Sequence, residues 1–101
     1  LHQVVLPISI EEINDSAFEN CRNLKSVSLP GALKTIGNAA FKGTGLRTIA
    51  IPESVFWIGN GVVADCQLLE HVTIPSNMDK IPEHMFEGCI NLKKTWNCMR
   101  G

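Results

Sequence analysis

The sequence has no tyrosine, no excess of either charge and no long apolar run. Nine Lys and Arg residues balance ten Asp and Glu residues, so the formal net charge is −1. A nucleic-acid binder needs a basic patch and a polybasic membrane anchor needs clustered Lys or Arg, so both classes are disfavoured. No apolar stretch approaches the roughly 20 residues of a membrane helix, which argues against membrane insertion.

An initiator methionine and a leader are also missing, because the sequence begins with Leu1 and no basic-then-apolar segment comes first. We therefore expect either a mature fragment or a piece excised from a longer chain, with any targeting signal outside this sequence. Hydrophobic residues make up 45% and charged residues 19% of the 101 residues. This composition is typical of one small folded domain and not of a disordered segment.

What the sequence does contain is a repeat. Four of its five prolines fall at intervals of 23, 22 and 23 residues, at Pro7, Pro30, Pro52 and Pro75. Three apolar columns keep the same register: Ile13, Ile36, Ile58 and Ile81; Phe18, Phe41, Val63 and Phe86; and Leu24, Leu46, Leu69 and Leu92. Several independent columns in one register indicate tandem units. One unit has 22 residues where the others have 23, and the missing residue falls in the Gly-rich segment 43–45, where a deletion costs least stability.

Each unit divides into two halves with different periods. The first half alternates apolar and other residues, as at Val27, Ser28 and Leu29, which predicts a strand that ends at the following proline. The second half fits no amphipathic helix, so we expect a short extended piece and then a helical turn around the Ala-Phe pair. Gly37 and Gly59 share a column with Pro82, whose φ near −65° excludes a left-handed residue at this position of that repeat.

The unit L-x-x-I-x-I-P…I-G-x-x-A-F-x-x-C resembles the BspA-like leucine-rich repeats over about residues 1–96. Segment 46–52 reads Leu-Arg-Thr-Ile-Ala-Ile-Pro on the strand side, and segment 36–41 carries the Ile-Gly and Ala-Phe signature. Ordinary leucine-rich repeats place Asn or Cys three residues after the last apolar strand residue. Those positions are Ala32, Ser54 and Asn77 here, so we expect no Asn or Cys ladder. The resemblance implies a curved solenoid of a cell-surface or secreted protein that adheres to host or matrix proteins.

One unit cannot bury its apolar side alone, so we predict a stack of about four repeats over residues 1–96. The predicted fold is a repeat solenoid, a leucine-rich-repeat-like right-handed superhelix. It has short parallel β-strands on one face and short extended or 3₁₀ turns on the other. The pattern decays at Thr95, so residues 97–101 are predicted to be a degenerate C-terminal tail or the exit to a further segment. Both ends of the stack should expose apolar faces, which predicts flanking repeats or self-association through an exposed end.

Three of the four cysteines share a repeat column. Thr44 is the remaining member of the column of Cys21, Cys66 and Cys89, which favours a small, buried or half-buried wall position occupied by free thiols. A disulfide between Cys66 and Cys89 on adjacent rungs is the sterically feasible alternative. Cys98 lies outside the column and is either a free thiol or an intermolecular link.

A zinc site is the sharper interpretation of two of these cysteines. Cys66, His71, His84 and Cys89 are spaced as C-x4-H-x12-H-x4-C, and all four are ligands that zinc prefers. The repeat register, however, puts His71 on a strand and His84 on the opposite side of the unit. The four side chains therefore do not converge, and we predict no metal and no cofactor.

Catalysis has little support in the sequence. The G-x-S-x-G, H-E-x-x-H and phosphate-loop patterns are absent. Adjacent Glu11 and Glu12, and Glu83 with Glu87, are explained by solvated turns. We predict that the protein is not an enzyme.

The outward positions of the strands are the candidate binding surface, because residues that alternate with the core residues point to solvent. The predicted protein-binding residues are Ser26, Ser28, Thr48, His71, Thr73, Lys94 and Trp96. Small side chains let a partner approach the strands closely, and Trp is enriched at binding hot spots. The simpler interpretation is ordinary solvent-facing strand residues, with Trp96 covered by a further repeat. Trp57 lies on the convex side, where it either packs between units or forms an outer contact.

We therefore predict a non-enzymatic protein-binding or adhesion module of a cell-surface or secreted protein, with a host or matrix protein as its partner. The alternative is a structural spacer solenoid that presents another domain. Neither nucleic acid nor a membrane interior is expected as a partner.

Overall fold

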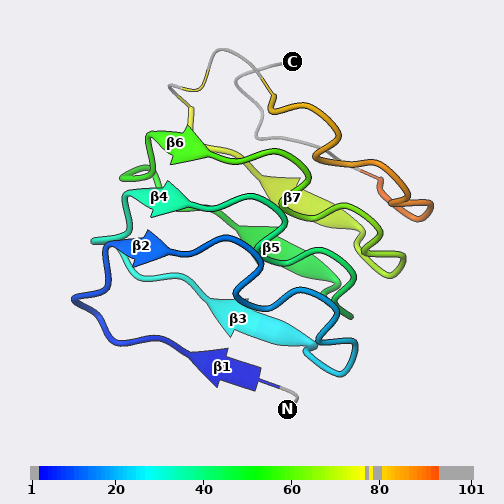
Figure 1. Cartoon of the computed structure of the whole chain (residues 1–101), viewed down its shortest axis with the longest axis horizontal. Helices are drawn as coiled ribbons and strands as arrows, with labels where there is room; N and C mark the ends of the chain where they lie inside the picture. Colours follow the sequence, from blue (N-terminus) through cyan, green and yellow to red (C-terminus); the bar gives the residue numbers. More distant parts are fainter. Residues whose placement is uncertain (1–2, 77, 79–80, 94–101) are drawn as a thin grey trace.

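The computed structural model describes residues 3–76, 78 and 81–93, which form a coil of seven short parallel β-strands joined by turns (Figure 1). The described residues include no helix, and so none that is long and apolar enough to cross a membrane. The strands occupy two sides of the coil in alternation, and hydrogen-bonded turns close a third side. The predicted solenoid with parallel strands is confirmed.

The first side carries the strands that precede the prolines. They are β1 (Gln3–Val5), β3 (Ser26–Ser28), β5 (Thr48–Ala50) and β7 (His71–Thr73), which follow one another up the stack (Figure 1). β1 pairs with β3 and β5 pairs with β7, both in parallel. β3 and β5 are in contact, but no sheet ladder joins them. The shortened turn at residues 43–45 lies in the chain between these two strands.

The second side carries strands of two residues each. They are β2 (Glu12–Ile13), β4 (Thr35–Ile36) and β6 (Trp57–Ile58), which form one parallel sheet. Their register places the three isoleucines side by side, and these side chains are buried. The sequence predicted an extended piece here, but not that successive pieces would pair into a sheet.

The third side is a series of tight turns, in agreement with the short 3₁₀ turns that the sequence predicted. Ala17 N–H donates to Asn14 O at 3.2 Å and Cys21 N–H donates to Phe18 O at 3.1 Å, as in 3₁₀ geometry. Alternate amides instead bond to the next rung: Phe18 N–H donates to Ala40 O at 2.8 Å. The turns are therefore tied to each other much as the strands are, which satisfies backbone groups that burial would otherwise leave unpaired.

Left-handed residues let the chain make these turns. Two repeat columns have positive φ: Ser16, Ala39, Gly61 and His84; and Asn20, Gly43, Asp65 and Gly88. The column of Gly37 and Gly59 is not among them, as Pro82 required. Those two glycines let adjacent rungs approach closely, because a Cβ on either would collide with the backbone nitrogen of the preceding rung, at Asp15 or Asn38.

The core fills the space between the three sides. Its largest fully buried side chains are Phe41, Leu24, Leu33, Ile36, Leu46, Leu69 and Met85. The rings of Phe18 and Phe41 stack with centroids 5.3 Å apart and planes inclined by 9°. Phe41 is covered from both directions, whereas Phe18 and Phe86 are only half-buried on the end rungs. In the first described rung the inward residues Val4, Leu6 and Ile10 are only half-buried, which agrees with the expected exposure of apolar residues at that end of the stack.

Candidate functional site

The predicted binding surface is the outer face of β3, β5 and β7. Ser26, Ser28, Thr48, His71 and Thr73 are all exposed on it. They alternate with inward residues of the same strands, such as Ile49 and Val72, which are buried. The predicted in-and-out register is therefore confirmed. Lys94 and Trp96 lie outside the described residues.

Pairing between rungs sets the neighbours on this face. Thr48 lies beside His71 and Ala50 lies beside Thr73 in the β5–β7 ladder. Ser26 lies beside Gln3 in the β1–β3 ladder. The other predicted residues that the structure describes are serines and threonines. The His71 imidazole is therefore the bulkiest side chain of the set.

A row of charged side chains borders this face, and the sequence analysis missed it. Arg47 Nη1 lies 3.8 Å from Glu70 Oε2, and Lys93 Nζ lies 3.8 Å from Glu70 Oε1. The three residues lie at intervals of 23, and Arg47 and Glu70 immediately precede β5 and β7. That periodic alternation of sign is the signal that could have revealed the row. Exposed pairs of this kind add little stability, so the row matters mainly as the charged edge of the face.

The cysteine column forms part of the core wall, as predicted. The Cys66 thiol is fully buried, donates to Phe41 O at 3.1 Å and lies 3.3 Å from Thr44 Oγ1. The Cys89 thiol donates to Val63 O at 3.0 Å. Cys21, Cys66 and Cys89 are free thiols, so the alternative disulfide is not formed. Cys98 lies outside the described residues.

Burial governs the chemistry of these thiols. Desolvation raises the pKa of Cys66 above its ordinary value of 9.0, and it raises the pKa of Cys89 to about 11. Both side chains are therefore thiols, not thiolates, at neutral pH, and a thiol is a poor nucleophile and a poor metal ligand.

The expectation that no Asn or Cys ladder exists was wrong. Asp15 Oδ1 accepts a hydrogen bond from Asn38 N–H at 2.8 Å, and Asn38 Oδ1 accepts one from Asn60 N–H at 2.7 Å. This Asp/Asn column lies just after β2, β4 and β6, whereas ordinary repeats place theirs after the other row of strands. Each side chain satisfies a turn amide of the next rung, which a sequence comparison at the usual position could not reveal.

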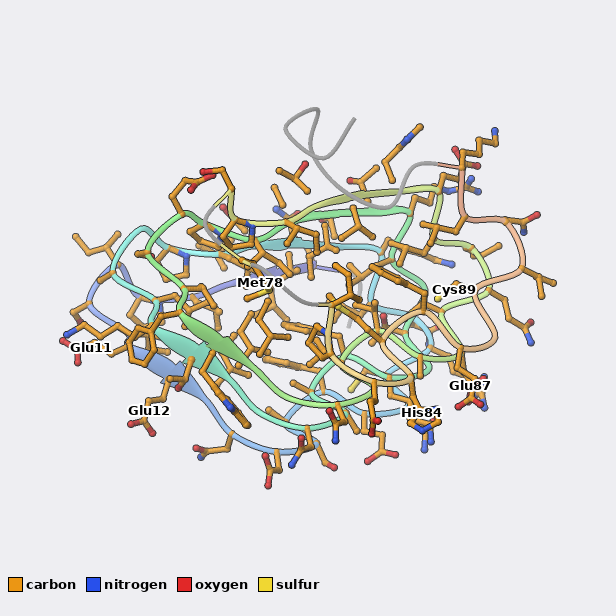
Figure 2. The ribbon with its side chains drawn as sticks, turned by 90° about the horizontal axis from the view of Figure 1, so that it is seen from above. Glu11, Glu12, Met78, His84, Glu87 and Cys89 are labelled. Atoms are coloured by element: carbon orange, nitrogen blue, oxygen red, sulfur yellow. The ribbon has the colours of Figure 1, made fainter. Side chains whose placement is uncertain are left out.

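The four residues with zinc-like spacing do not converge. Cys66 and Cys89 line the core wall, His71 is on the outer face of β7, and His84 is in an exposed turn. His84 Nδ1 lies 3.7 Å from Glu87 Oε1, and Figure 2 shows this pair at one corner, with Glu11 and Glu12 at the opposite end. Within residues 3–76, 78 and 81–93, no three His, Cys, Asp or Glu residues are grouped to hold a metal ion.

An open hollow lies on the outer side of the β2–β4–β6 sheet, and the sequence analysis did not predict it. It has a volume of about 420 Å³. The residues that line it are Glu12, Ile13, Asn14, Asp15, Thr35, Gly37 and Trp57. Trp57 is an outward residue of β6 that lines this hollow, and 48% of its surface is exposed.

Comparison with known proteins identifies the family. The family model described as BspA type leucine rich repeat region matches residues 1–98, in six copies. The chain belongs to the BspA-type leucine-rich repeat family. A search of curated proteins gave no match.

Solved structures similar to this BspA-type chain come from several bacteria. A leucine-rich repeat protein from Bacteroides ovatus has a TM-score of 0.91 and 40% identity, and the match covers 94% of this chain and 25% of that one. The T. pallidum leucine-rich repeat protein has a TM-score of 0.88 and 34% identity, over 91% of this chain and 44% of that one. A leucine rich cell surface protein from Faecalibacterium prausnitzii, at 24% identity, shares the fold, with a TM-score of 0.80 over 94% of this chain and 32% of that one. The chain therefore spans less than half the length of each of these proteins.

Proposed function

We propose that this BspA-type solenoid is a non-enzymatic protein-binding or adhesion module of a cell-surface or secreted protein. Its binding surface is the outer face of β3, β5 and β7, and its partner is a host or matrix protein. One observation carries the proposal: the five predicted residues on these strands are all exposed and lie on one face. The family resemblance supports the compartment and the class of partner.

The shape and chemistry of the face suit a protein partner. Serine, threonine and alanine side chains leave a low surface, so a partner can lie close to the strands. The hydroxyls of Ser28 and Thr48 can donate and accept hydrogen bonds, and the His71 imidazole offers an aromatic ring with a polar tip. The row of Arg47, Glu70 and Lys93 supplies a charged rim beside it, which resembles the polar rim of known interfaces.

A structural spacer is the second candidate, and the continuous ladders favour it. Backbone hydrogen bonds link successive rungs along the strands and along the turns, for example from Phe41 N–H to Val62 O at 2.9 Å. Such a stack resists bending and sets a fixed distance between its ends. In this alternative the face of β3, β5 and β7 has no partner of its own.

Two matched histidines separate the candidates. His71 and His84 are both exposed, but His71 is on the proposed face and His84 is in a turn. Binding to immobilised matrix proteins, such as collagen and laminin, is measured for the wild type, His71→Ala and His84→Ala. We expect His71→Ala to weaken binding by about fivefold or more, as a hot-spot residue does, and His84→Ala to change it by less than about twofold. Equal affinities for the two variants would contradict the proposed face, and no binding to any matrix protein would favour the spacer.

A further inference from the structure

The sheet on the other side of the coil carries a second surface, which is independent of the proposed function. Glu12, Thr35 and Trp57 are the outward residues of β2, β4 and β6, and they occupy one register position across three rungs. All three line the open hollow of about 420 Å³, together with Asn14 and Asp15. The hollow therefore combines an aromatic ring, a hydroxyl and carboxylates on one small surface.

Trp57 is not needed to complete the core. The inward position of β6 belongs to Ile58, which is buried, while the indole lies outside with 48% of its surface exposed. The neighbouring Phe56 side chain is 67% exposed. Large apolar side chains exposed together and bordered by polar groups mark interaction sites.

The charged residues that line the hollow are both acidic, Glu12 and Asp15. Segment 8–21 contains four carboxylates, at Glu11, Glu12, Asp15 and Glu19, and no Lys or Arg. Glu11 pairs with Lys34 at 3.6 Å, and Asp15 accepts the Asn38 amide. Among the described residues, the Glu12 carboxylate has neither a hydrogen bond nor an ion pair, although it lines the hollow. A ligand with positive charge would therefore find an unused acceptor there.

We propose that this hollow binds an arginine side chain of a basic protein segment. The guanidinium plane lies against the Trp57 indole, and its N–H groups donate to the Glu12 carboxylate. Rungs are about 4.8 Å apart, so the backbones at these two residues are about 10 Å apart, with the short Thr35 side chain between them. A long, planar side chain that stacks on one wall and reaches the other fits this distance. Arginine fits better than lysine, because its flat fork both stacks and donates along its edge.

The charge of Glu12 also decides against the nearest competing ligand. A sugar ring can stack on an indole, but it is neutral and leaves the negative charge of Glu12 without compensation. A guanidinium uses both features, so charge complementarity favours a basic segment. A carbohydrate is kept as an outcome of the test.

The test uses nuclear magnetic resonance of the ¹⁵N-labelled chain with two small probes. N-acetylarginine amide carries the guanidinium, and N-acetylcitrulline amide has the same shape without the charge. We expect arginine to shift the Trp57 indole and Thr35 amide signals saturably, with a dissociation constant on the order of 10 mM. Citrulline should bind at least about threefold more weakly, and about 0.5 M NaCl should weaken arginine binding.

Three variants assign the contacts, each read at the Thr35 amide. Glu12→Gln and Trp57→Ala should each weaken arginine binding by about two- to fivefold. Glu83→Gln is the matched control, because Glu83 is also exposed but lies in a turn away from the hollow, and it should bind like the wild type. Three results would overturn the proposal: equal binding of citrulline, wild-type affinity in Glu12→Gln, or no shift with arginine. Tighter binding of N-acetylglucosamine at the same signals would assign the hollow to carbohydrate instead.

Discussion

Phe41→Ala tests whether the repeat columns are stacked as described. Phe41 is fully buried, and its ring lies against that of Phe18 with centroids 5.3 Å apart. Removal of the ring leaves a cavity inside the stack, because the ladders on its sides prevent the rungs from closing over it. A fully buried Phe→Ala change costs about 3–5 kcal/mol, against a total stability of about 5–15 kcal/mol for a domain.

Position in the stack determines the size of the effect. Phe18 belongs to the same column but is half-buried on an end rung, so Phe18→Ala should cost about half as much. Phe41→Val should also cost less than Phe41→Ala, because Val63 occupies the same column in the next repeat. This variant keeps the comparison available if Phe41→Ala does not fold. Ser28→Ala, on the exposed face, should stay within about ±0.5 kcal/mol.

The assay is equilibrium unfolding in urea, followed by circular dichroism at a strand wavelength. The free energy of unfolding is compared at constant slope, so that a change in midpoint reports stability alone. A cost of Phe41→Ala below about 1.5 kcal/mol would refute the central position of this column. Equal costs for Phe41→Ala and Ser28→Ala would mean that the inward and outward positions are exchanged.

Two further predictions concern the turns and the thiols. Gly37→Ala should destabilise the fold by about 1–3 kcal/mol or more in the same urea assay, because its Cβ would collide with the Asp15 backbone. Gly31→Ala is the control and should be nearly neutral, because its Cβ meets no atom within 4 Å. An unchanged stability in Gly37→Ala would contradict the close approach of the rungs. Burial raises the folded-state pKa of Cys66, and it raises that of Cys89 to about 11 from an ordinary value of 9.0. The stability due to the protonated thiols is therefore complete below pH 9.0 and is lost as the pH rises towards 11. Urea midpoints measured across that window should fall in the wild type and fall less in Cys89→Thr, and identical slopes would contradict the pKa shift.

Much of the fold could be predicted because it depends on features repeated along the chain. The columns of Leu24, Ile36 and Phe41 identified the core, and the alternation that ends at each proline identified the strands. The same alternation gave the exposed face of β3, β5 and β7. These features are local in the sequence, and the repeat multiplies each signal.

The details of the turn side could not be predicted, because their determinants are contacts between rungs. Left-handed residues include Ser16 and Ala39, and neither serine nor alanine is a residue type enriched at positive φ. The bond from Asn60 N–H to the Asn38 side chain joins residues 22 apart, and it depends on how closely two turns overlap. The hollow at Trp57 likewise exists only because three outward residues from successive rungs meet in register.

The most direct test of the proposed binding face is an amide chemical-shift map of the ¹⁵N-labelled chain with the matrix protein that binds it most tightly. The account predicts that perturbed amides cluster at residues 26–28, 48–50 and 71–73, and that those of β2, β4 and β6 stay unchanged. Perturbation confined to the turns around Ala39 and Gly61, or spread evenly over the chain, would contradict it.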